Sequence, residues 1–76
     1  MEYIIDFSGI CDAKSIHQTL ARTLNFPDWY GHNLDALYDC LSEMGQLEVE
    51  VQNINDDNRY AALCVKVMRA AGVTLV

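Results

Sequence analysis

Two adjacent aromatic residues lie in a short loop of the segment FPDWYGHNLDALYDCL, residues 26–41. Trp29 and Tyr30 stand between Pro27 and Gly31. A loop of this length can hardly bury two large rings, so we expect both side chains to be exposed. Hot spots in protein–protein interfaces are rich in Trp and Tyr surrounded by polar groups. The loop therefore predicts contact with another protein.

A line of acids follows this loop. Asp35, Asp39 and Glu43 recur at intervals of four residues, so a helix would place them on one face. Like charges at this spacing destabilise an isolated helix by roughly 0.2–0.5 kcal/mol per pair. The helix dipole favours an acid in the first turn, but not Glu43 in the last. A solvated face is the ordinary explanation of such acids, but beside exposed aromatic residues they indicate a binding face for a cationic pocket.

Capping residues predict that this helix covers residues 34–44. Asn33 is a preferred N-cap, and Gly45 is a typical C-terminal stop. At about 100° per residue, the predicted buried arc consists of Leu34, Leu37, Tyr38, Leu41 and Met44. The predicted exposed arc consists of Asp35, Asp39, Ser42 and Glu43.

The charges are unevenly distributed along the chain, whose net charge is −6. Residues 1–22 hold three acids and two bases, residues 23–58 hold eight acids without Lys or Arg, and residues 59–76 hold three bases without an acid. An acidic middle repels phosphates and anionic lipids, which argues against nucleic acid and membrane partners. The partner expected for it is a basic protein or, less often, a metal ion.

The rest of the chain predicts alternating strands and helices. Strands are expected at residues 2–7, 47–51 and 73–76, and a helix capped by Asp12 at residues 13–24. A last helix should bury the stripe Tyr60, Leu63, Cys64, Val67 and Ala71, with Asn55, Asp56 or Asp57 as its cap. The order β-α-α-β-α-β predicts an α/β fold, a small parallel three-stranded sheet with helices packed on it. We expect one domain over residues 1–76.

His17 falls on the apolar stripe of the first helix, where a histidine at the edge of the core with a satisfied hydrogen bond is expected rather than a catalytic one. Three widely spaced cysteines, Cys11, Cys40 and Cys64, indicate reduced, buried thiols. The start of the chain does not resemble a signal peptide, and no apolar run is long enough for a membrane span. These features predict a cytoplasmic protein.

Three stretches carry a resemblance to a known family: HQTL at residues 17–20, FPDWYG at 26–31 and NLDALYDCL at 33–41. They resemble the barstar family of intracellular inhibitors of small secreted ribonucleases such as barnase. The match is long and ungapped through the loop and second helix. It implies a parallel three-stranded α/β fold in which that loop and helix plug the active site of the ribonuclease.

The resemblance also implies roles for single residues. Asp39 matches the acid that enters the phosphate-binding pocket, and Asp35 matches an acid at its rim. Trp29 occupies the place of a Tyr that packs on the catalytic histidine of the ribonuclease. Further positions matching the contact are Gly31, Asn33, Leu34, Tyr38 and Ser42. Tyr30 and Glu43 complete the predicted binding face, and no cofactor is implied.

Some residues depart from the family pattern. Tyr38 and Met44 stand where the family commonly carries Trp, and His32 replaces an acid. The segment before the last helix is shorter. The family's acid on the last helix corresponds to about Val67. These differences bear on the identity of the partner more than on the fold.

Two other classes of function are consistent with the acids. His32, Asp35 and Asp39 could ligate a metal in an enzyme, although His32 precedes the helix and the three span two turns. A hydrolase with paired carboxylates is disfavoured because a convex helix face offers no cleft. An acidic interaction module without inhibitory activity is the main alternative. We expect a non-enzymatic protein that is monomeric when free.

Overall fold

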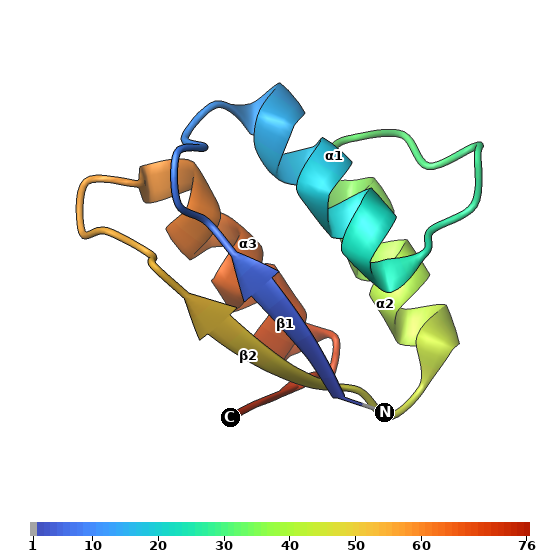
Figure 1. The fold of residues 1–76 in the computed structure, drawn as a ribbon. Coiled ribbons are helices and arrows are strands. Elements are labelled where there is room, and N and C mark those ends of the chain that lie inside the picture. The colour runs from blue at the N-terminus through green and yellow to red at the C-terminus, as the bar shows by residue number, and fades with distance from the viewer. Residues whose placement is uncertain (1) are drawn as a thin grey trace.

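The computed structural model of the chain describes residues 2–76 and contains three strands and three helices (Figure 1). In chain order they are β1 (Glu2–Asp6), α1 (Ala13–Leu24), α2 (Leu34–Met44), β2 (Glu48–Gln52), α3 (Arg59–Ala70) and β3 (Thr74–Leu75). The predicted order β-α-α-β-α-β is confirmed, and the first two helices have the predicted bounds. The strands differ from their predicted ranges by one residue at their ends.

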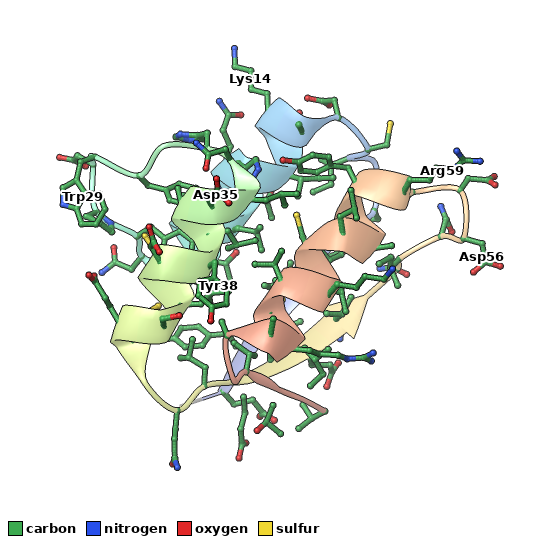
Figure 2. The ribbon with its side chains drawn as sticks, turned by 180° about the vertical axis from the view of Figure 1, so that it is seen from behind. Lys14, Trp29, Asp35, Tyr38, Asp56 and Arg59 are labelled. Carbon is green, nitrogen blue, oxygen red and sulfur yellow. The ribbon has the colours of Figure 1, made fainter. Side chains whose placement is uncertain are left out.

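The sheet is parallel with β2 in its centre, in the order β1-β2-β3. Tyr3 pairs with Val49, and Val49 pairs in turn with Leu75. The helices lie together on one side of the sheet: Figure 1 views the strands from their open side, and Figure 2, from behind, shows α2 and α3 in front. The protein is therefore built from two layers.

The core lies between these layers. Alternate residues of each strand point into it, because successive side chains of a strand face opposite sides. Ile5 of β1 and Val49 of β2 are fully buried, whereas Ile4 and Glu48 on the other face are exposed. The helices contribute the buried residues Ile16, Leu20, Leu24, Leu37, Cys40, Leu41, Ala61, Cys64 and Met68.

Each helix begins at a side-chain cap. Asp12 accepts a hydrogen bond from the Ser15 amide at 2.9 Å, as predicted. The cap of α3 is Asn58 instead of the predicted Asn55, Asp56 or Asp57; its Oδ1 accepts from the amide of Ala61 at 3.2 Å. Asn58 is buried, and its Nδ2 donates to the Ile10 carbonyl at 2.9 Å. This second bond anchors the cap to the loop after β1, a contact that local sequence does not reveal.

The buried stripe of α3 is also rotated from the predicted one. Leu63 is 43% exposed, whereas Ala61 and Met68, outside the predicted stripe, are fully buried on either side of Cys64. The sequence of α3 offers two overlapping apolar stripes. Packing in the folded protein selects the stripe that runs through Ala61, Cys64 and Met68.

His17 is completely buried in α1, deeper than the predicted core edge, and its hydrogen bonds are satisfied as predicted. Nδ1 lies 2.6 Å from the Tyr30 hydroxyl, and Nε2 lies 2.7 Å from the Tyr60 hydroxyl. Burial lowers the pKa of His17, and the neighbouring His32 lowers it further. The folded protein therefore favours the neutral imidazole.

This lowered pKa predicts a pH-dependent stability. In the unfolded chain His17 titrates near a pKa of about 6.5. Stability should be fully present above that value and fall as pH drops toward the lower folded pKa, because the unfolded chain then binds an extra proton. The slope for one proton is at most about 1.4 kcal/mol per pH unit. Urea unfolding of the wild type between pH 7.5 and 5.5 measures it.

The matched variants are His17→Gln and His32→Gln. His17→Gln should lose this pH dependence whatever its absolute stability, and His32→Gln should keep most of it. Equal pH slopes in the wild type and in His17→Gln would show that His17 does not control stability in this range.

Candidate partner-binding site

The loop between α1 and α2 turns its two adjacent aromatic residues in opposite directions. Trp29 is 68% exposed, whereas Tyr30 is only 4% exposed. The prediction that both rings are exposed is therefore wrong for Tyr30. The physical reason is that its hydroxyl reaches His17 inside the core, at 2.6 Å.

Other aromatic residues surround the Tyr30 ring. Its centroid lies 4.7 Å from that of Phe26 and 5.0 Å from that of His32, both in tilted arrangements. The Tyr30 amide also donates to the Pro27 carbonyl at 3.0 Å, which closes a turn around Trp29. Burial raises the pKa of Tyr30, so its hydroxyl stays protonated and can donate. The loop is thus fixed to the core by Tyr30, and it exposes Trp29 on its outer side.

The junction between the loop and α2 is tightly built. His32 has a left-handed backbone with a φ of 54°, and its Nδ1 donates to the Tyr30 carbonyl at 2.9 Å. Asn33 accepts from the Ala36 amide at 2.8 Å and donates to the Gly31 carbonyl at 3.2 Å. A Cβ on Gly31 would lie 3.2 Å from the side-chain nitrogen Nδ2 of Asn33. Gly31 and Asn33 therefore fix where α2 starts relative to Trp29.

The polar face of α2 is exposed as predicted, and it consists of Asp35, Asp39, Ser42 and Glu43. Within residues 2–76 none of its three acids has a salt bridge partner. Figure 2 shows Asp35 near the start of α2, on the helical side of the molecule, with Trp29 projecting from the loop beside that helix. The fold therefore brings the aromatic and acidic parts of the predicted site together.

The apolar residues of the predicted site lie beside this face. Leu34 is half-buried, and Tyr38 is 45% exposed, contrary to its predicted place on the buried arc. The buried arc is centred on Leu37, Cys40 and Leu41, which leaves Tyr38 at its edge, between α2 and α3 (Figure 2). The predicted arc of the helical wheel did not include Cys40, although the spacing of the cysteines predicted a buried thiol there.

The neighbouring helix α3 has the opposite charge. Its exposed side chains include Arg59, Lys66 and Arg69, and it contains no acid. Val67, near the position where the resemblance predicts an acid in the family, is half-buried against the core. Charge on α3 would therefore not add to the attraction that α2 exerts on a cation.

The two enzyme hypotheses required a metal site or a pair of carboxylates in a cleft. The residues that the structure describes contain no group of three His, Cys, Asp or Glu placed to hold a metal ion. An open hollow of about 550 Å³ lies between α1 and the loop, and Asp28 is the one acid in its lining. It does not provide a pair of carboxylates.

The three cysteines are free thiols. Cys40 and Cys64 are buried as predicted, whereas Cys11 is exposed, contrary to prediction, in the loop before α1. Burial raises the pKa of Cys64 to about 11 and also raises that of Cys40. Both therefore remain neutral thiols at physiological pH, which suits packing rather than nucleophilic attack. Within residues 2–76, no helix is both long and apolar enough to cross a membrane.

Comparison with known proteins agrees with this geometry. Residues 1–72 match the family model described as Barstar (barnase inhibitor). A stretch of 39 residues, 51% of this chain, is 49% identical to the "Putative ribonuclease inhibitor YrdF" of Bacillus subtilis (strain 168) and covers 43% of that protein. The family match extends over nearly the whole fold, including the loop and α2. The chain therefore belongs to the barstar family.

Proposed function

We propose that this chain is a protein inhibitor of a small secreted ribonuclease of the barnase type. It would bind the cationic active site of the enzyme with the acidic face of α2 and the Trp29 loop. The observation that carries the proposal is the exposed, unpaired line of acids on α2, held next to an exposed Trp29. Family membership and the name of the Bacillus relative support the same role.

The mechanism is imitation of the substrate's phosphate. The Asp39 carboxylate, near the middle of α2, would occupy the phosphate-binding pocket and meet its cations. Asp35 would bind at the rim of the pocket, and Trp29 would cover the catalytic histidine. Such a complex blocks access of RNA without changing the enzyme covalently, so the inhibitor itself needs no catalytic group and no cofactor.

The remaining site residues would shape the contact. Gly31 and Asn33 set the approach of the loop to α2, and the half-exposed Leu34 and Tyr38 provide apolar contact beside the acids. Ser42, Glu43 and the buried Tyr30 complete the set. Tyr30 would support the loop from the core and would not touch the partner, because its ring is buried.

The proposed setting is the cytoplasm of the cell that makes the ribonuclease, where the inhibitor acts as an antitoxin and is monomeric when free. Nucleic acid and membranes are not proposed as partners, because residues 23–58 carry only acidic charge. The direct test is an RNA-cleavage assay with barnase. Loss of cleavage at one inhibitor per enzyme supports the proposal, whereas binding without loss of cleavage would favour an acidic interaction module.

Asp39 should be the most sensitive single position for binding. Asp39→Ala should weaken the complex by about 4–8 kcal/mol, a range taken from hot spots that include the barnase–barstar pair itself. The loss is large because cations in the pocket of the ribonuclease would remain buried without a counter-charge. Titration calorimetry measures it. Glu48→Ala, on the open side of the sheet, is the control, and an equal loss in both variants would contradict the assignment of Asp39.

The side chain of Trp29 should change from solvent-exposed to buried on binding. It is the single tryptophan of the chain, so labelling the inhibitor with 5-fluorotryptophan gives one ¹⁹F resonance. In the free protein that resonance should show the solvent isotope shift of an exposed indole, and the shift should shrink in the complex. A resonance that is shielded from solvent before binding, or unchanged after it, would exclude Trp29 from the contact.

The acids should also accelerate association. Electrostatic steering can raise an association rate constant to about 10⁸–10⁹ M⁻¹s⁻¹ at low salt, against roughly 10⁵–10⁶ without it. Since salt screens this field over about 10 Å at 0.1 M, association should slow sharply as salt rises, while dissociation changes less. Stopped-flow binding measures both rates.

Two variants distinguish effects on the association rate from effects on the dissociation rate. Glu48→Gln with Glu50→Gln should lower the association rate modestly and leave dissociation almost unchanged. Asp39→Asn should mainly accelerate dissociation. An association rate that does not depend on salt would mean that the acids do not guide the partner.

A further inference from the structure

A buried chain of hydrogen bonds connects the loop to two helices that lie outside the proposed contact. Tyr30 of the loop, His17 of α1 and Tyr60 of α3 are linked in series, with His17 in the middle. The two distances, 2.6 and 2.7 Å, are those of good hydrogen bonds. The link between α1 and α3 joins residues 43 positions apart in the sequence.

The surroundings determine which atoms donate. A neutral imidazole has one N–H donor and one bare nitrogen. Tyr30 is buried, so its hydroxyl hydrogen needs a protein acceptor, which Nδ1 of His17 provides. Nε2–H then donates to the oxygen of Tyr60, whose own hydrogen can reach water because Tyr60 is only partly buried. This assignment satisfies all three groups, and no buried side-chain polar atom among the described residues lacks a partner.

The position of Trp29 depends on this series of hydrogen bonds. With 68% of its surface exposed, the Trp29 side chain has few contacts of its own. Its backbone is held by Tyr30, whose ring is fixed by the bond to His17 and by the neighbouring rings of Phe26 and His32. His17 in turn is oriented by Tyr60 at its other nitrogen.

We infer that Tyr60 is a positioning residue for the partner-binding loop. Acting through His17 and Tyr30, its hydroxyl holds the loop in the conformation that presents Trp29. The consequence for partner binding rests on the proposed function, whereas the consequence for the loop does not. A loop that is already ordered loses less freedom on binding, so removing the hydroxyl should weaken a complex without removing any contact in it.

The first experiment examines the free protein. Tyr60→Phe removes one hydroxyl and keeps the ring. Time-resolved fluorescence anisotropy of Trp29 should then show a larger amplitude of fast local motion than in the wild type. Tyr30→Phe breaks the same chain at its other end and should give a similar change, which provides a second variant if Tyr60→Phe folds poorly. The control is Tyr3→Phe, which removes the hydroxyl of another half-buried tyrosine, on β1.

The second experiment measures binding to barnase. Tyr60→Phe should weaken the complex by about two- to tenfold, the range set by the net contribution of one hydrogen bond. Tyr3→Phe should leave the affinity within about twofold, the lower edge of that range. An unchanged affinity in Tyr60→Phe, despite a looser Trp29, would overturn the role in binding.

Stability measurements complete the test. If Tyr60→Phe lowers the free energy of unfolding but leaves the Trp29 anisotropy at the value of Tyr3→Phe, Tyr60 only supports the core and the inference is wrong. If the wild type does not bind barnase but the anisotropy changes as expected, the proposed partner is wrong and the positioning of the loop by Tyr60 stands.

Discussion

The conformation of the loop between α1 and α2 depends on the buried His17, which is hydrogen-bonded to both Tyr30 and Tyr60. It is completely buried, with one tyrosine hydroxyl at each ring nitrogen. A buried ring nitrogen without a partner costs more free energy than an ordinary hydrogen bond gains. The hydroxyls of Tyr30 in the loop and Tyr60 on α3 therefore offset the cost of burying His17.

The hydrogen bond between His17 and Tyr30 also determines how Trp29 and α2 are placed in the proposed contact. Because Tyr30 is held inside, its neighbour Trp29 is turned outward, and the chain must then reverse within a few residues to start α2. The left-handed backbone of His32 and the cap at Asn33 make that reversal. The start of α2 is thereby fixed next to Trp29. One polar interaction in the core thus controls how an exposed aromatic residue and a line of exposed acids are placed relative to each other.

The secondary structure of this fold could largely be predicted from local sequence. The bounds of α1 and α2 were predictable because Asp12, Asn33 and Gly45 signal helix ends by themselves. The parallel sheet followed from the alternation of strands and helices.

Burial was less predictable than secondary structure, since it depends on residues distant in the sequence. Nothing in the loop indicates that Tyr30 has a partner at His17, or that Asn58 has one at Ile10. Similarly, the exposure of Tyr38 and Leu63 is decided by how α2 and α3 pack, and each helix has more than one possible apolar stripe. The exposure of the acidic face of α2 was therefore better predicted than the exposure of the aromatic residues near it.

The acids of α2 have an unfavourable arrangement if folding alone is considered. Asp35, Asp39 and Glu43 repel one another along one face, and Glu43 lies near the negative end of the helix dipole. The helix tolerates them because its N-cap is satisfied and because Leu37, Cys40 and Leu41 on its other face are buried. The exposed bases of the C-terminal segment lie on α3, so they do not interrupt this face. An acidic face without its own counter-charges is stabilised most by a cationic surface from outside, which is the interaction that an inhibitor of a basic active site requires.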